Sequence, residues 1–346
     1  MRVHVYTGSL GVVAKSGVGQ AVFHQQKMLE KAGASVTDSW RGRADAVHIN
    51  TVFPDAVFAA LRARARGETV VYYGHSTMQD FRDSFVGSNL LAPLFRLWLC
   101  FCYRLGDIVI TPTPYSQKIL ESYGLRRPVF ALSNGVDTEF FAPDTAHRAA
   151  FRCRWQLEET EKVVVSAGHF MERKGILEYI ALAREMPQVR FLWFGYTDPA
   201  LVPPQVKAAM AAAPANLTFA GYVDQAALRD AYCGADAFVF CSHEETEGIV
   251  VLEALACGIP TVLRDIPVYE GWLEDGENVY KARDEEDFGV LLGGVLAKQL
   301  PDLTAAGRAT AKGRSLESIG CQLMALYARA DEARAKKPRR APALRT

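Results

Sequence analysis

The sequence predicts an α/β protein built from two doubly wound, Rossmann-like domains that face a central cleft. Its 346 residues exceed the size at which one hydrophobic core usually divides into two. Short apolar runs alternate with amphipathic helical stretches in both halves, a pattern typical of parallel sheets covered by helices. Residues 133–144 are rich in Asn, Gly, Asp and Pro and interrupt this rhythm as a linker would. We therefore expect an N-terminal domain over residues 1–136 and a C-terminal domain over residues 145–312.

Both halves contain short apolar runs that predict buried strands. The N-terminal strands are expected at residues 3–6, 46–49, 69–73, 108–111 and 129–132, with helices at 18–31 and 54–65. The C-terminal strands are expected at residues 163–167, 189–194, 217–220, 237–240 and 261–263. Ligands of such sheets bind beyond the carboxyl ends of the strands, so the cleft is the expected site.

The overall composition is that of a globular protein, with 49% hydrophobic residues, 23% charged residues and a formal net charge of zero. Residues 329–346 contain seven basic and two acidic side chains, a net +5 that the rest of the chain balances. The tail at 331–346 is therefore expected to be a basic arm that either solubilises the chain or binds anionic lipids. We expect no nucleic-acid partner.

The seven cysteines are scattered, mostly within apolar runs, and no two of them form a CxxC pair. This pattern predicts buried thiols in a reducing compartment and no zinc site. The first residues enter a strand directly, without the pattern of a signal peptide, so a cytoplasmic protein is expected.

The segment HEETEGIVVLEALACGIPTV contains the strongest candidate site. The helix expected at 248–257 is apolar on every side except at Glu253, and a buried carboxylate needs a hydrogen-bonding partner. Glu245 lies in the loop before this helix. The first N–H groups of the helix, at Gly248 and Ile249, favour an anion such as a diphosphate.

Two Glu residues separated by seven positions and followed by Ala and a Gly-x-Pro turn resemble the donor-site signature of family 4 glycosyltransferases. The resemblance implies the GT-B fold, a retaining reaction with a nucleotide sugar, and a last helix, here 313–330, that crosses back onto the first domain. It also implies that Glu245 contacts the transferred sugar and that Glu253 holds the ribose. Many members carry Phe where this chain has Glu247. The alternatives are a core ion pair for Glu253 and a solvated acidic loop at 244–247.

A second segment, SLGVVAKSGVGQ, carries Gly17 and Gly19, with Asp38 about 20 residues further on, which partly matches a dinucleotide-binding fingerprint. An NAD-dependent oxidoreductase is therefore an alternative. The match is weak because the fingerprint turn follows its strand directly, whereas Gly17 comes about ten residues after the strand. In family 4 the same position holds a glycine-rich loop that approaches the donor diphosphate. A plain flexible loop is the third interpretation.

A third segment, AGHFMERKGI, follows a strand and opens a helix, and it resembles the Gly-Arg…Lys-Gly motif of the family. The resemblance implies that His169, Arg173 and Lys174 bind the donor phosphates, with Arg173 supplying the guanidinium that is commonest at position 169. Paired cations and a helix N-terminus can stabilise a departing diphosphate without a metal ion. The sequence has no Asp-x-Asp pair, and we expect neither a metal nor another cofactor. The alternative is that Arg173 and Lys174 are ordinary surface residues.

His75 follows the strand expected at 69–73, at the cleft end of the first sheet. The resemblance implies that His75 faces the sugar and the acceptor and orients hydroxyl groups through a ring nitrogen. It would complete a catalytic set with Glu245, Lys174 and Arg173. The alternative is a loop histidine that its neighbours satisfy.

Residues 90–105 form the most apolar run of the chain. The run is shorter than the roughly 20 residues of a membrane span, and Arg96 at its middle would cost about 3 kcal/mol at the centre of a bilayer. We expect a core helix, and the alternative is a helix with one face among lipid headgroups.

Within family 4, the chain is similar to bacterial transferases that extend a monohexosyl diacylglycerol to a dihexosyl diacylglycerol. The similar segments are SGVGQAVFHQQ, HINTVFPDA, YYGHSTMQDF, GSNLLAPLF and DIPVYEGWL. The implied function is transfer of glucose or galactose from a UDP-sugar to this glycolipid at the inner face of the cell membrane. The alternatives are a family 4 enzyme with a soluble or cell-wall acceptor and a non-catalytic nucleotide-sugar-binding protein.

Overall fold

The computed structural model describes residues 1–13 and 16–335, and within these residues the chain forms two parallel β-sheets. The first sheet has the strand order β2-β1-β3-β4-β5-β6. Its strands are β1 (Arg2–Tyr6), β2 (Ser35–Thr37), β3 (Ala46–Ile49), β4 (Thr69–Tyr73), β5 (Ile108–Thr111) and β6 (Val129–Ala131). The second sheet has the order β12-β11-β10-β7-β8-β9. Its strands are β7 (Val163–Ala167), β8 (Arg190–Phe194), β9 (Leu217–Gly221), β10 (Ala237–Phe240), β11 (Thr261–Arg264) and β12 (Tyr280–Ala282).

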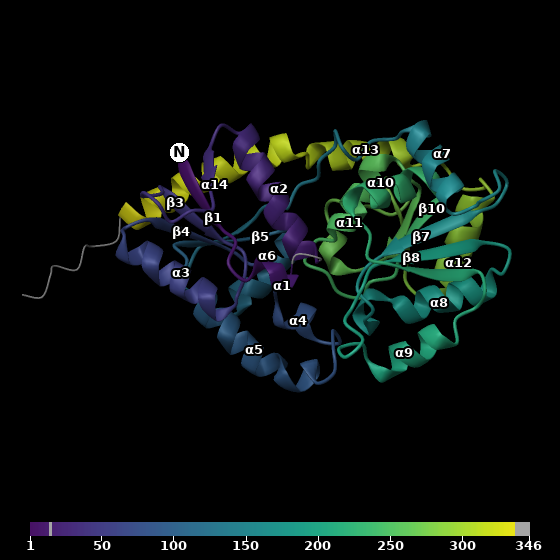
Figure 1. Cartoon of the computed structure of the whole chain (residues 1–346), viewed down its shortest axis with the longest axis horizontal. Coiled ribbons are helices and arrows are strands. Elements are labelled where there is room, and N and C mark those ends of the chain that lie inside the picture. The colour runs from purple at the N-terminus through teal and green to yellow at the C-terminus, as the bar shows by residue number, and fades with distance from the viewer. Residues whose placement is uncertain (14–15, 336–346) are drawn as a thin grey trace, which may run out of the picture.

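Two doubly wound halves are therefore present, and the predicted fold class is confirmed (Figure 1). All ten predicted strands exist, but β2 and β12 were missed. Each is a three-residue strand at the edge of its sheet. Their sequences, SVT and YKA, mix polar with apolar residues and form no continuous apolar run, whereas the equally short edge strand β6 reads VFA and was predicted.

The helices of the first half connect its strands along the chain and pack around the first sheet. They are α1 (Leu10–Val13), α2 (Gly17–Lys31), α3 (Pro54–Ala65), α4 (Met78–Phe81), α5 (Ser88–Tyr103) and α6 (Pro114–Ser122). Local sequence sets several of their starts. Pro54 opens α3, where its missing N–H costs no helical hydrogen bond. Thr113 caps α6, and its hydroxyl accepts a hydrogen bond from the Ser116 N–H at 3.2 Å.

The second sheet is covered in the same way. Its helices are α7 (Thr145–Arg154), α8 (Ile176–Glu185), α9 (Pro204–Ala211), α10 (Gln225–Gly234), α11 (Ile249–Cys257), α12 (Glu285–Leu296) and α13 (Thr304–Gly313), with 3₁₀ turns η1 (Glu172–Lys174) and η2 (Pro267–Tyr269). Helix α11 is buried on almost every side, as its sequence predicts. Gly248 at φ +88° and Gly258 at φ +72° bound it, in a backbone region that residues with a Cβ rarely enter.

Helix α14 (Leu316–Ala335) crosses from the second half back onto the first, which confirms the predicted crossing helix (Figure 1). It extends beyond the expected end at residue 330. Its apolar face joins the core of the first sheet through Leu316, Ile319, Leu323, Leu326, Tyr327 and Ala330. The two crossings of the chain lie together, because Val136 and Ser315 form a parallel bridge. The predicted basic tail lies outside the described residues from position 336 onward.

Helix α5 corrects the prediction of a core helix at 90–105. One side of α5 is buried, including Ala92, Leu99 and Cys102. The opposite side exposes Leu90 (86%), Leu91 (48%), Leu94 (66%), Leu97 (67%) and Phe101 (49%). The exposed side could not be recognised from the sequence, because the residues on both sides of the helix are mostly apolar. No helix in the described part of the chain is long and apolar enough to cross a membrane.

Candidate active site

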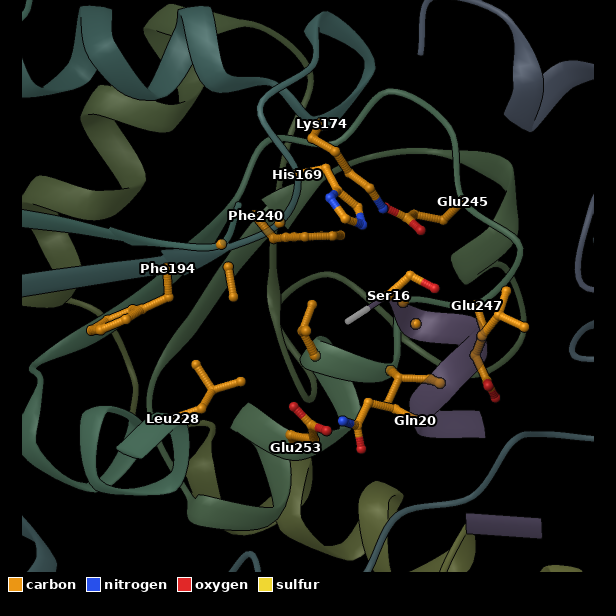
Figure 2. Close-up of a pocket in the computed structure, with 18 of the residues that line it drawn as sticks. Ser16, Gln20, His169, Lys174, Phe194, Leu228, Phe240, Glu245, Glu247 and Glu253 are labelled. Atoms are coloured by element: carbon orange, nitrogen blue, oxygen red, sulfur yellow. The ribbon is translucent and has the colours of Figure 1, made fainter. Parts of the chain in front are cut away.

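A cavity of about 280 Å³ lies between the two halves and is lined by residues from both. The first half contributes the start of α2 and His75, which follows β4. The second half contributes the segments after β7, β8, β9 and β10 and the start of α11. Figure 2 shows Ser16 and Gln20 on one side and Lys174, Glu245 and Glu253 around the same space. The cavity therefore lies where the carboxyl ends of parallel strands meet, as expected.

The partly buried Lys174 and the buried Glu245 form an ion pair inside this cavity, between Nζ and Oε1 (Figure 2). Gly175, at φ +72°, lets the turn that carries Lys174 pack on the end of β10, since a Cβ there would lie 2.3 Å from the Cys241 carbonyl oxygen. Burial lowers the pKa of Lys174, and Glu245 opposes this effect. Burial alone would raise the pKa of Glu245, but the charges of Lys174 and Arg173 outweigh it and hold that pKa below its ordinary value. The Glu245 side chain is therefore a carboxylate near neutral pH.

Glu253 is 1% exposed and has only neutral partners among the described residues. Its Oε1 accepts from Gln225 Nε2 at 3.1 Å, and its Oε2 accepts from the Tyr232 hydroxyl at 3.5 Å. Burial raises the pKa of this carboxyl to about 8. The alternative of a core ion pair with Arg or Lys is therefore wrong.

The loop before α11 is buried, so the alternative of a solvated acidic loop is also wrong. Glu245 is 6% exposed and Glu247 is 1% exposed. Glu247 Oε2 accepts from the backbone N–H of Asn134 at 2.9 Å and from its side chain at 2.8 Å. Glu244 Oε2 accepts from the Tyr115 hydroxyl at 2.9 Å. The Thr113 hydroxyl also donates to the Thr246 carbonyl. Three residues of the first half thus hold this loop by hydrogen bonds.

The start of α11 faces the cavity through Gly248 and Ile249. Gly248 is the N-cap and offers no side chain to the free N–H groups of the first turn. A helix start of this kind carries a partial positive charge and favours an anion. Lys174 and these N–H groups line the same space.

Arg173 lines the cavity, but protein groups already engage its guanidinium. Its Nη1 lies 3.0 Å from Asp80 Oδ1 and donates to the Glu244 carbonyl at 2.6 Å, and its Nε donates to Ser84 Oγ at 3.1 Å. Asp80 and Ser84 belong to the first half, so Arg173 joins the two halves. The interpretation of Arg173 as an ordinary surface residue is wrong, and its expected contact with a phosphate stays a prediction.

His169 also lines the cavity and has a hydrogen-bonding partner. Its Nδ1 lies 2.7 Å from the Tyr196 carbonyl oxygen, which can only accept, so Nδ1 carries the proton. Burial lowers the pKa of the ring, which favours the neutral form. Only Nε2 is then available to a ligand, and it donates to a phosphate only if a second proton binds.

Gly17 and Gly19, which were expected in a glycine-rich loop, lie in a helix instead. Gly17 is the first residue of α2 and lines the cavity, whereas Gly19 lies in the first turn of α2 and is not among the lining residues. Helix α1 intervenes between β1 and Gly17. The turn that a dinucleotide-binding fingerprint needs directly after the strand is therefore not formed here.

His75 is 7% exposed, lines the cavity and contacts Asn50 Oδ1 through Nε2 at 2.8 Å.

The structure thus brings together nine of the ten predicted site residues around one cavity, and only Gly19 is not among the lining residues. These nine are Gly17, His75, His169, Arg173, Lys174, Glu245, Gly248, Ile249 and Glu253.

Comparison with known proteins decides the family. Residues 17–140 match the family described as Glycosyltransferase Family 4, and residues 148–310 match Glycosyl transferases group 1. The chain is also 38% identical over 328 residues to a processive diacylglycerol alpha-glucosyltransferase of Acholeplasma laidlawii, covering 94% of this chain and 98% of the relative. The chain is a family 4 glycosyltransferase.

Two further comparisons agree with this assignment. An alpha-galactosylglucosyldiacylglycerol synthase of Streptococcus pneumoniae is 27% identical over 295 residues, covering 81% of this chain and 76% of the relative. The crystal structure of Anabaena HepE, solved with UDP and glucose, superposes with a TM-score of 0.73 at 16% identity and covers 94% of this chain and 99% of that one. The likeness to HepE supports the GT-B fold alone. The alternative of an oxidoreductase is excluded by family membership.

Sequence reasoning missed the side of the glycosyltransferase cavity that is formed by apolar and aromatic residues. These are Phe194 at the end of β8, Tyr196 just after it, Tyr222 just after β9, and Leu228 on α10. Figure 2 shows Phe194 and Leu228 on the side of the cavity away from Gln20. The available signal was position, because residues directly after parallel strands face the cleft.

Proposed function

We propose that this glycosyltransferase moves a hexose from a UDP-sugar to a membrane glycolipid, most simply a monohexosyl diacylglycerol, and forms a dihexosyl diacylglycerol. The observation that carries the donor assignment is the arrangement of ionisable groups in the cavity. The buried carboxyl group of Glu253, which has no cationic partner, lies at one end, and the Lys174–Glu245 pair lies beside the start of α11. A nucleoside diphosphate sugar supplies ribose hydroxyls, a diphosphate and sugar hydroxyls in that order.

Each part of the donor has a matching group. Phe194 and Leu228 offer an apolar wall to a flat base, and Glu253 accepts hydrogen bonds from the ribose. Lys174 and the first N–H groups of α11 receive the diphosphate, which gains negative charge as the sugar leaves. These groups supply the stabilisation that a divalent cation gives in other transferases, so we propose a reaction without a metal or other cofactor.

We further propose that the reaction retains the anomeric configuration. UDP-glucose and UDP-galactose carry their sugar in the α configuration, and the names of both diacylglycerol relatives specify alpha linkages. An α donor that yields an α product requires retention. Glu245 is suited to hold hydroxyls of the transferred sugar in this reaction, because its Oε1 is already oriented by Lys174 and by Ser242 Oγ at 2.7 Å.

The glycolipid acceptor requires that the enzyme reach a membrane surface, and α5 provides a suitable face. Its exposed residues Leu90, Leu94, Leu97 and Phe101 recur at helical spacing and form one apolar stripe. Exposed arginines that can meet anionic headgroups occur on α3 and just before and after α5 in the chain: Arg62, Arg64, Arg82 and Arg104. A peripheral helix of this composition lies in the headgroup region with its apolar face inserted.

The test is a transfer assay with purified protein, vesicles that contain monohexosyl diacylglycerol, and labelled UDP-glucose or UDP-galactose. We expect a dihexosyl lipid with an α linkage from one of the two donors, and undiminished turnover in EDTA. Release of labelled sugar to water or to soluble oligosaccharides, with no labelled lipid, would favour the soluble or cell-wall acceptor. Binding of UDP-hexose with neither transfer nor hydrolysis would favour a non-catalytic binding protein.

A further inference from the structure

The side chain of Asn50 lies against His75, and two parallel strands bring them together. Strands β3 and β4 pair in register, with Ile49 opposite Tyr72, so the chain leaves both strands at the same edge of the sheet. Asn50 directly follows β3, and His75 comes two residues after β4. Asn50 is 3% exposed, and its side-chain Oδ1 lies 2.8 Å from His75 Nε2.

Several contacts fix the position of the His75 ring. The ring stacks on Tyr73 with centroids 4.6 Å apart and an interplanar angle of 18°. The backbone before it is held where Gly74 N donates to the Ile110 carbonyl at 2.6 Å and the Thr111 hydroxyl donates to the Gly74 carbonyl at 2.9 Å. One face of the ring therefore packs on Tyr73 and Nε2 contacts Asn50, which leaves Nδ1 as the remaining polar group of the ring.

We propose that Asn50 is a positioning residue that sets the tautomer of His75, with the proton on Nε2 and the lone pair of Nδ1 available to a substrate hydroxyl. A carbonyl oxygen can only accept a hydrogen bond, so a neutral ring that contacts Asn50 Oδ1 must carry its proton on Nε2. Burial lowers the pKa of His75 to about 3, which keeps the ring neutral at the pH of the reaction.

This assignment names the chemical class that His75 can bind. A bare nitrogen lone pair accepts from a hydroxyl and repels a phosphate oxygen, which has no proton to donate. His75 thus contacts a sugar hydroxyl of the donor or the acceptor, not the diphosphate, and it cannot act as a cation there. This inference rests on the proposed transferase function and adds the orientation of one catalytic side chain.

The primary test observes the tautomer directly. The protein is labelled with ¹⁵N-histidine, and the His75 resonances are assigned by comparison with His75→Gln. We expect a protonated Nε2 and an unprotonated Nδ1 in the wild type. Asn50→Asp keeps an accepting oxygen and should keep this tautomer, whereas Asn50→Leu should allow a mixture. A protonated Nδ1 in the wild type, or an unchanged spectrum in Asn50→Leu, would overturn the proposal.

The kinetic test uses the same variants. Loss of a group that orients another through a hydrogen bond typically costs tenfold to a hundredfold in activity, so Asn50→Leu should lower kcat by roughly that factor. Asn50→Asp should recover most of the loss. The UDP affinity should not change in either variant, because the residues that we propose to hold UDP belong to the second domain, and unchanged affinity also shows that the variants fold. Equal kcat in all three proteins would refute the role of Asn50, whereas a wild type that neither binds nor uses UDP-hexose would refute the proposed function instead.

Discussion

The buried carboxyl of Glu253 should couple donor binding to pH, and Glu253→Gln tests this coupling. Burial raises the pKa of this group from 4.5 to about 8 in the free protein. At pH 7 the folded protein therefore keeps the proton, whereas ribose hydroxyls donate hydrogen bonds and favour the carboxylate. Binding of UDP-hexose should release up to one proton near neutral pH. The affinity should rise by up to about tenfold per pH unit between pH 6 and 8 and level off above pH 8.

The raised pKa of Glu253 also predicts how the free energy of unfolding changes with pH. A raised pKa means that the unfolded chain loses its proton first, so Glu253 destabilises the fold as pH rises from about 4.5 to about 8. A shift from 4.5 to about 8 corresponds to a cost on the order of 5 kcal/mol once pH exceeds 8. Glu253→Gln should therefore raise the free energy of unfolding by a few kcal/mol at pH 8 and by little at pH 4.5.

The assay is calorimetric titration of UDP-hexose in buffers of different ionisation enthalpy, which counts the released protons. Two lost charge-assisted hydrogen bonds of about 1.5 to 3 kcal/mol each amount to about 3 to 6 kcal/mol, so Glu253→Gln should bind UDP-hexose at least about a hundredfold more weakly above pH 8. The matched control is Glu244→Gln, because burial also raises the pKa of Glu244 to about 7. Proton release that persists in Glu253→Gln and disappears in Glu244→Gln would refute the assignment of Glu253 to the ribose.

Three further predictions address the sugar, the leaving group and the membrane. Glu245→Gln should lower kcat with little change in donor KM, because its contact with the sugar matters most in the transition state; a change in KM alone would contradict this. Lys174→Ala should lower kcat by about tenfold to a hundredfold, with activity in both proteins unaffected by EDTA; loss of wild-type activity in EDTA, restored by Mg²⁺, would show that a metal takes part. Replacement of Leu90, Leu94 and Leu97 by Ser should reduce sedimentation with anionic vesicles by at least about tenfold. The control is Val290→Ser, which changes a comparably exposed apolar side chain (68%) on α12 of the second domain. Equal sedimentation of the triple variant and the control would exclude α5 as the docking face.

Sequence reasoning succeeded where one physical signal dominated. The buried strands were found because parallel strands covered on both faces are continuous apolar runs, and α11 was found because it is apolar on every side apart from Glu253. The residues that follow such strands could then be predicted from the sequence to lie at the carboxyl-end edge of the sheet. The edge strands β2 and β12 lacked this signal, since polar residues interrupt their short sequences, SVT and YKA.

The two faces of α5 show a second kind of limit. Periodicity identifies a buried face only when the opposite face is polar. In α5 both faces are apolar, so Leu99 in the core and Leu97 at the surface could not be told apart from sequence. What distinguishes them is the position of the helix on the first domain, where nothing among the described residues covers Leu90, Leu94 or Leu97.

Arg173 shows a third limit, and it bears on the chemistry. The sequence places Arg173 beside Lys174 and suggests equal roles, but the fold gives them different partners. Lys174 pairs with Glu245 of its own domain, whereas Arg173 binds Asp80 and Ser84 of the other domain, about 90 positions earlier in the chain. No local pattern predicts such a contact. Arg173 therefore joins the two halves at the cavity, and Lys174 is the cation that we propose to stabilise the departing diphosphate. In steady-state kinetics, loss of Arg173 should therefore raise the donor KM, whereas loss of Lys174 should lower kcat.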